Sequence, residues 1–216
     1  MNPWKERVEI GPHVLYLGDC REILPTLTAD AVVTDPPYGV SFRYEGHDDN
    51  RTDYMLCIPQ WFGAMRRATT GPVAVSCGVA NIQDWPKSDW TLAWHKPASM
   101  GRCCVGFNNW EPILLYGKPM GESGADVVRA CLIPNDSLAG HPCPKPTEWA
   151  AGIIRRVALK CETILDPFMG SGTTGVACAN LGRKFIGVEI HEPYFRIACR
   201  RIADAVNGGV QPELFA

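Results

Sequence analysis

Short apolar runs rich in β-branched residues alternate along this chain with longer segments of helical spacing. Residues 14–17, 31–34 and 72–77 are such runs and predict buried strands. Residues 53–68 have the apolar spacing of a helix, which Pro59 would kink or begin. Strands that alternate with helices are typical of an α/β fold. The pattern therefore predicts an α/β protein.

The final third of the chain has the clearest alternation. A helix is predicted from Thr147, its expected N-cap, to about Lys160, and a strand follows at 163–165. A glycine-rich turn, a helix at about 173–181, a strand at 184–188 and a helix at about 193–206 come next. This order predicts a β-turn-α-β unit.

The middle of the chain, residues 89–146, has a weaker pattern. Residues 90–94 and 112–116 predict two strands that would suit an antiparallel pair. Residues 117–145 are rich in Gly and Pro and lack periodicity. We expect this last stretch to form long loops over one face of the protein.

Composition narrows the class of protein. The chain has 216 residues, 46% hydrophobic and 20% charged, which is typical of one globular domain. Its 21 Lys and Arg against 23 Asp and Glu give a net charge of −2, so any contact with nucleic acid must be local. No apolar run reaches the roughly 18 to 20 residues of a membrane span, and residues 1–10 are too charged for a signal peptide. We expect a soluble, cytoplasmic protein without a membrane partner.

Ten cysteines raise the question of a metal site. No pair of them has the Cys-x-x-Cys spacing, and without a secretory signal they are expected to be reduced thiols. Cys131, His141 and Cys143 come nearest to a ligand cluster, but scattered thiols explain them better. We expect no metal.

The glycine-rich turn at residues 170–175 is the first candidate for chemistry. It matches G-x-G-x-x-G, with Gly170 and Gly172 as its first two glycines, and lies between a predicted strand and a predicted helix. Glu189 ends the next predicted strand, where a carboxylate can accept both hydroxyls of a ribose. The combination predicts an adenosine-containing ligand, whereas a turn used only for helix packing would not need the acid.

The charge beside this turn helps to choose the ligand. Asp166 directly precedes the turn, and its carboxylate would repel a pyrophosphate but suit the cationic S-adenosylmethionine. A dinucleotide-binding unit also normally begins the chain, and this one lies near the end. S-adenosylmethionine is therefore favoured, with an NAD-dependent oxidoreductase as the alternative from another enzyme class.

A second candidate site is the tetrad Asp35-Pro36-Pro37-Tyr38. It follows the predicted strand at 31–34, at the edge of an open α/β sheet where ligands bind. Taken alone, the tetrad is explained equally well as a stiff turn between a strand and a loop.

The residue types of the tetrad suit the methylation of an exocyclic amino group. The Asp35 carboxylate and the Pro36 carbonyl would each accept one amino hydrogen, which leaves the nitrogen lone pair to attack a methyl group. The Tyr38 ring would stack on the base, a contact worth roughly 1 to 3 kcal/mol. Flipping a base out of a duplex costs a few kcal/mol, so stacking is of the right size to offset it.

The tetrad together with residues 168–174, Phe-Met-Gly-Ser-Gly-Thr-Thr, resembles the amino-methylating DNA methyltransferases. Because the tetrad precedes the glycine turn, the order resembles that of their beta class. The resemblance covers nearly the whole chain and implies a Rossmann-like, S-adenosylmethionine-dependent methyltransferase fold in one domain, residues 1–216. It implies a mostly parallel seven-stranded sheet with an antiparallel edge pair and a circularly permuted motif order.

The resemblance also implies roles for residues. Asp19 resembles the acid at the cofactor adenine, and His141-Pro142 with Lys145-Pro146 resembles the segment that folds against the methionine end of the cofactor. Residues 110–114, Trp-Glu-Pro-Ile-Leu, are similar to a family strand with an aromatic residue or histidine before Glu. The implied catalytic residues are Asp35, Pro36, Pro37 and Tyr38, and the implied cofactor-binding residues are Asp19, Asp35, Lys145, Asp166, Phe168, Gly170, Gly172, Thr173, Thr174 and Glu189.

The target base rests on a single residue. In this family Asp at the first position of the tetrad is associated with adenine, and cytosine enzymes more often have Ser. The expected reaction is transfer of a methyl group to N6 of adenine in DNA by base flipping, with cytosine N4 as the alternative. A DNA-binding module that keeps the fold without turnover is a third, non-catalytic interpretation.

The residues that would read the DNA are few. Residues 39–51 follow the tetrad and would close over a flipped base, with Phe42 near it and Arg43 and Arg51 on phosphates, unless the stretch is simply an exposed loop. The arginine pairs 66–67, 155–156 and 200–201 are expected to be solvated helix ends.

Little room is left for a separate recognition domain. A target-recognition region must fit within about 96–142. We therefore expect either a homodimer or a monomer of low sequence specificity. An orphan or phage-borne modifier and the modification half of a restriction system fit the sequence equally.

Overall fold

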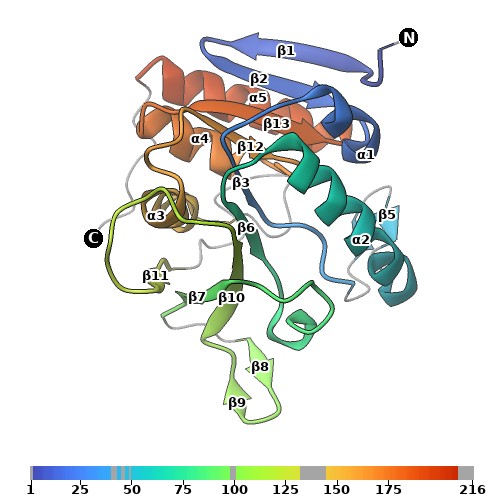
Figure 1. Ribbon diagram of the computed structural model, residues 1–216. Helices are drawn as coiled ribbons and strands as arrows, with labels where there is room; N and C mark the ends of the chain where they lie inside the picture. The colour runs from blue at the N-terminus through green and yellow to red at the C-terminus, as the bar shows by residue number, and fades with distance from the viewer. Residues whose placement is uncertain are drawn as a thin grey trace.

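The computed structural model describes residues 2–39, 43–44, 47–48, 50–97, 101–131 and 145–208. Within these residues one nine-stranded sheet forms the centre of the protein (Figure 1). Its strands, in spatial order, are β1 (Glu6–Ile10), β2 (His13–Leu17), β13 (Lys184–Glu189), β12 (Thr163–Asp166), β3 (Ala31–Thr34), β6 (Val73–Ser76), β10 (Trp110–Tyr116), β7 (Trp90–His95) and β11 (Val127–Arg129). Two short hairpins, β4 (Arg43–Tyr44) with β5 (His47–Asp48) and β8 (Arg102–Cys103) with β9 (Gly106–Phe107), lie outside it.

The strand directions confirm an α/β fold with a mixed sheet. Strands β2, β13, β12, β3 and β6 run parallel to one another. β1 is antiparallel to β2, and β10 is antiparallel to both β6 and β7, as the sequence predicted for the latter pair. The parallel strands end at one edge of the sheet, which is where ligands bind in folds of this class.

The expected number of seven strands is too low, because the sequence analysis missed two edge strands. β1 alternates exposed and half-buried positions, so it lacks the apolar run that marks a buried strand. β11 has three residues, lies in the Gly- and Pro-rich stretch and pairs parallel with β7. Both are short strands at the outer edges, where packing demands least of the sequence.

Helices cover both faces of the sheet (Figure 1). α1 (Cys20–Ile23) and α2 (Arg51–Ala68) pack on one face. The 3-10 turn η1 (Leu24–Thr26) follows α1, and the 3-10 turn η2 (Val79–Asn81) follows β6. α3 (Thr147–Val157), α4 (Thr173–Asn180) and α5 (Glu192–Val206) pack on the other. Within the described residues, no helix is long and apolar enough to cross a membrane.

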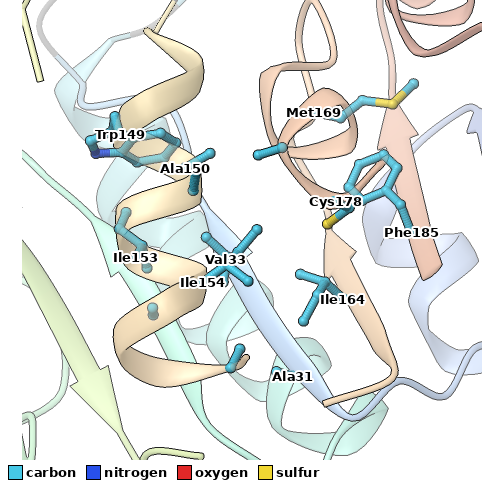
Figure 2. Close-up of a cluster of buried hydrophobic side chains, with 14 of the residues drawn as sticks. Ala31, Val33, Trp149, Ala150, Ile153, Ile154, Ile164, Met169, Cys178 and Phe185 are labelled. Atoms are coloured by element: carbon cyan, nitrogen blue, oxygen red, sulfur yellow. The ribbon is translucent and has the colours of Figure 1, made fainter. Parts of the chain in front are cut away.

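The hydrophobic core is divided by the sheet into two clusters. In β3, Val33 belongs to the cluster under α3, α4 and α5, and Val32 belongs to the cluster under α1 and α2, as the two-residue period of a strand requires. Figure 2 shows Val33 beside Ile154 of α3, with Ile164 of β12 close by in the same cluster. Because β3 is buried on both faces, its end is fixed firmly in place.

Two local details differ from the expectations. The helix expected at residues 53–68 is α2, which begins at Arg51 and continues through Pro59, so the proline does not begin it; apolar residues on both sides of the proline are buried. Thr147 is the first residue of α3, whose N-cap is Pro146, so it makes no capping hydrogen bond.

Candidate active site

The two candidate segments of the sequence meet at one edge of the sheet. The Thr34 hydroxyl, at the end of β3, donates a 2.6 Å hydrogen bond to Oδ1 of Asp166, at the end of the neighbouring strand β12. The Thr174 hydroxyl, from the first turn of α4, donates to Oδ2 of the same carboxylate at 2.7 Å. The buried Asp166 side chain thus joins the start of the tetrad to the glycine-rich turn.

Asp166 has an environment suited to this joining role. It is only 3% exposed, and its pKa is raised to about 6 by burial, which the hydrogen bonds from Thr34 and Thr174 oppose. The backbone N–H of Phe168 donates to it as well, at 3.0 Å. These donors favour the ionised form, so the carboxylate orders the loop that follows β12.

The glycine-rich turn folds tightly under a second buried acid. The Gly170 N–H donates to Oε2 of Glu189 at 2.9 Å, and the His191 N–H donates to Oε1 at 2.8 Å. Burial raises the pKa of Glu189 to about 7, against the effect of these backbone donors. Glu189 ends β13, as expected, and lies against the turn that would hold an adenosine ligand.

Asp19 lies near Glu189 because a backbone hydrogen bond joins the ends of their two strands. Gly18 donates its N–H to the Glu189 carbonyl at 2.9 Å, so the end of β2 and the end of β13 are adjacent. The Asp19 carboxylate caps α1 by accepting from the Arg21 N–H and forms a 2.5 Å ion pair with the Arg21 side chain. Asp19 is therefore at the expected edge, with its carboxylate engaged by Arg21.

The tetrad follows β3 directly. Asp35 Oδ1 accepts a 2.6 Å hydrogen bond from the Tyr38 hydroxyl, and Oδ2 forms a 2.8 Å ion pair with Lys145 Nζ. The Lys145 ammonium also lies 5.2 Å from the centroid of the Tyr38 ring, in the arrangement of a cation–π contact. Both oxygens of the Asp35 carboxylate thus have a donor from the protein itself.

Lys145 is also held from the side of the glycine-rich turn. Its carbonyl accepts a 3.0 Å hydrogen bond from the hydroxyl of Thr173, the first residue of α4. Lys145 therefore connects the glycine-rich turn, through its backbone, with Asp35, through its side chain. The sequence-predicted residues at this edge form three groups of contacts, which the glycine-rich turn brings together along the chain: Tyr38, Asp35, Lys145 and Thr173; Asp166 and Thr174; Gly170 and Glu189.

Other predicted residues have different surroundings. Phe168 packs edge-on against Trp61 of α2, with ring centroids 5.0 Å apart. Arg51 forms a 2.7 Å ion pair with Asp84. The backbone of Arg43 lies in β4, and Phe42 is outside the described residues.

The structure describes only part of the segment before α3 and of the group Cys131, His141 and Cys143. His141, Pro142 and Cys143 are outside the described residues, and Cys131 is exposed. The nine cysteines that the structure describes are free thiols.

Arg201 was expected to be solvated, and that expectation is wrong. The residue is 6% exposed, and one guanidinium nitrogen donates to the Ser171 carbonyl at 2.7 Å and lies within 3.3 Å of the Thr173 hydroxyl. Burial lowers its pKa to about 10. Position 201 falls on the apolar face of α5, next to Ile202 and Ala198, and that helical spacing was the signal in the sequence.

Three further residues at the tetrad were not predicted as site residues. Ser76 ends β6, and Glu111 lies on β10, where it faces the Tyr38 hydroxyl. Lys96 forms a 2.6 Å ion pair with Glu111. Glu111 follows Trp110 in the strand that resembled the family, whereas nothing in the sequence marks Lys96.

Comparisons with known proteins point to one family. A family model for N6/N4 methyltransferases, described as DNA methylase, matches residues 110–200. The type II methyltransferase M.ScaI of Streptomyces caespitosus is 26% identical over 92% of this chain and 84% of its own length. The chain is similar to the N6/N4 DNA methylases.

Other relatives agree over shorter stretches. Type II methyltransferase M2.LlaDCHI of Lactococcus lactis subsp. cremoris is 43% identical over 70 residues, which are 32% of this chain and 26% of that protein. Type II methyltransferase M2.DpnII of Streptococcus pneumoniae is 45% identical over 62 residues, 29% of this chain and 23% of that protein.

Solved structures of DNA methyltransferases have the same fold. The M1.HpyAVI–SAM complex superposes with a TM-score of 0.64 at 26% identity and covers 87% of this chain and 98% of that chain. The cytosine-N4-specific PvuII DNA methyltransferase superposes with a TM-score of 0.70, covers 97% of each chain and is 16% identical, so it supports the fold alone. The relatives therefore favour a DNA methyltransferase over the alternative of an NAD-dependent oxidoreductase.

Proposed function

We propose that this DNA methyltransferase transfers the methyl group of S-adenosylmethionine to N6 of adenine at specific sites in DNA, with the target base flipped out of the duplex. The observation that carries the proposal is the placement of Asp35. The 2.6 Å hydrogen bond between Thr34 and Asp166 fixes the start of the tetrad beside the glycine-rich turn. A base held by Asp35 is therefore next to a cofactor held by that turn.

The residues at the turn fit S-adenosylmethionine, which supplies an electrophilic methyl group when bound. Glu189 provides a carboxylate for the ribose, and Asp19 lies at the adjacent strand end for the adenine. Asp166 adds negative charge that suits a cationic ligand. Gly170, Gly172, Thr173, Thr174, Phe168 and Lys145 complete the proposed cofactor site.

The tetrad supplies the acceptors for the target amino group. Asp35 and the Pro36 carbonyl each accept one amino hydrogen, and the stiff Pro36-Pro37 segment keeps that carbonyl directed at the amino group. In this structure Oδ2 of Asp35 is paired with Lys145, which lies over the Tyr38 ring, and Oδ1 accepts from the Tyr38 hydroxyl. The amino group of the base takes the position of that hydroxyl at Oδ1, while Lys145 stays on Oδ2.

The identity of the base is tested by its product. DNA incubated with the enzyme and S-adenosylmethionine is digested to nucleosides and analysed by mass spectrometry. We expect N6-methyldeoxyadenosine, because the tetrad begins with Asp. N4-methyldeoxycytidine would replace the proposal by its alternative, and sequencing that reports modified bases on the same DNA gives the recognition sequence.

The DNA is proposed to contact the segment between β7 and β10, within the region 96–142. This segment leaves the sheet at the edge where β6 and β3 end, and its β8–β9 hairpin projects from the molecule (Figure 1). Val105 at its tip is 91% exposed. The proposed phosphate contact of Arg51 requires that it leave Asp84.

The small size of this region leads to a proposal on assembly, either a homodimer or a monomer of low sequence specificity. Sedimentation of the protein with and without a duplex distinguishes these states. A monomer that binds a long site with high specificity would contradict both.

The buried acid Glu189 gives a prediction for pH dependence. Its pKa of about 7 means that it gains its charge between pH 6 and pH 8, and the charged form is the better acceptor for ribose hydroxyls. We expect S-adenosylmethionine to bind about tenfold more tightly at pH 8 than at pH 6, as measured by calorimetry. Glu189→Gln serves as the reference, because it keeps the shape but does not titrate, and an equal pH dependence in this variant would refute the role.

A further inference from the structure

Two carboxylates face a single hydroxyl at the proposed base site. The Tyr38 oxygen lies 2.6 Å from Oδ1 of Asp35 and 3.2 Å from Oε2 of Glu111. Ser76 Oγ is the third neighbour, at 3.3 Å. The two acids approach the phenol from different strands, since Asp35 follows β3 and Glu111 is on β10.

The hydroxyl can serve only one of these acids at a time. Burial and then the charges of Asp35 and Glu111 raise the pKa of Tyr38 well above its ordinary value, so the hydroxyl keeps its hydrogen. A phenol has one hydrogen to donate, and the shorter distance assigns it to Asp35 in this structure. Glu111 is then an acceptor within reach of the same oxygen.

Glu111 is held in place independently of the tetrad. Its Oε1 forms a 2.6 Å ion pair with Lys96, and the two side chains are 15% and 7% exposed. Glu111 lies opposite Trp94 in the β10–β7 register, and the Lys96 ammonium is 5.4 Å from that ring. The pair therefore keeps Oε2 aimed at Tyr38 whether or not Asp35 is occupied.

We propose that Glu111, fixed by Lys96, is a positioning residue that accepts a hydrogen bond from the Tyr38 hydroxyl when the target amino group binds Asp35. The hydroxyl hydrogen turns from one carboxylate to the other, so that the hydrogen bond to Asp35 is replaced by one to Glu111 with no covalent bond broken and no proton transferred. Oδ1 of Asp35 is then free for the base, while the Tyr38 ring stays in position for stacking. This inference rests on the proposed function, because it requires a base at Asp35.

The substitution Glu111→Gln separates this role from a purely structural one. Lys96 only donates hydrogen bonds, so the new amide turns its oxygen toward Lys96 and its NH2 group toward Tyr38. The Tyr38 oxygen then receives a hydrogen bond from position 111 and keeps its own hydrogen on Asp35. The change locks the hydroxyl in the arrangement that competes with the base.

The test compares kcat for methyl transfer to unmethylated DNA among wild type, Glu111→Gln, Tyr38→Phe and the double variant. We expect Glu111→Gln to lower kcat by about 10- to 100-fold in the presence of Tyr38. In the Tyr38→Phe background there is no hydroxyl to lock, so Glu111→Gln should change kcat by less than about twofold. Glu162→Gln is the matched control, since it removes an exposed 2.6 Å ion pair with Lys184 far from the tetrad in sequence.

The outcomes distinguish the inference from the function on which it rests. A loss of equal size with and without the Tyr38→Phe substitution, accompanied by a lower Tm, would assign a structural role to Glu111 and overturn the inference. Full activity of Glu111→Gln with Tyr38 present would overturn it as well. If the wild-type enzyme binds S-adenosylmethionine but methylates no DNA, the proposed function itself fails.

Discussion

Replacing Asp35 with Ala is expected to lower methyl transfer to DNA by about 10²- to 10⁴-fold and to leave S-adenosylmethionine affinity nearly unchanged. The carboxylate is the proposed acceptor for the target amino group, and Ala offers no acceptor in its place. Tyr38 and Lys145 also lose the partner that they share in this structure. Transfer is measured with labelled cofactor, and cofactor affinity by calorimetry.

Asp204→Ala is the control for this experiment. Asp204 is an exposed acid on α5, so its loss tests whether removal of any carboxylate has the same effect. We expect the control to transfer methyl groups like wild type. If Asp35→Ala instead lost cofactor affinity in proportion to activity, Asp35 would act on the cofactor and the proposed arrangement of the base would be wrong.

The sequence predicted best those strands that are buried on both faces. The apolar run at residues 31–34 is β3 to the residue; strands flank both of its edges, and the two core clusters under the helices cover both of its faces. β1 was missed because its mixture of charged and apolar residues follows from an edge position that only the assembled sheet defines. Local pattern therefore identifies central strands well and edge strands poorly.

The candidate site also has features that the sequence predicted and features that it did not. The meeting of the tetrad with the glycine-rich turn followed from the rule that parallel strands end at one edge, and the Thr34–Asp166 hydrogen bond is the result. The ion pair of Lys96 with Glu111 could not be predicted, because it depends on the turn between β7 and β10. Arg201 was misjudged because an arginine pair usually lies in solvent, and its partners in the turn are some 30 residues away in sequence.

The glycine-rich turn gives the second large prediction. Gly172 has a φ of 84°, and a Cβ there would lie 2.9 Å from the Ala198 Cβ on α5. Gly172→Ala therefore combines an unfavourable backbone conformation, about 1–2 kcal/mol, with overpacking against α5, about 1–3 kcal/mol. We expect the free energy of unfolding to fall by about 2–5 kcal/mol in urea titrations. Cofactor affinity should fall with it, because the turn moves away from its place beside Glu189.

Gly182→Ala separates the two causes. Gly182 also has a positive φ, 64°, but a Cβ there would meet nothing within 4 Å. This variant should lose only the backbone contribution of about 1–2 kcal/mol and bind S-adenosylmethionine like wild type. The difference in unfolding free energy between the two variants then measures the cost of overpacking between the turn and α5. Equal losses of stability, with cofactor affinity unchanged in both, would show that the turn does not depend on α5 for its shape.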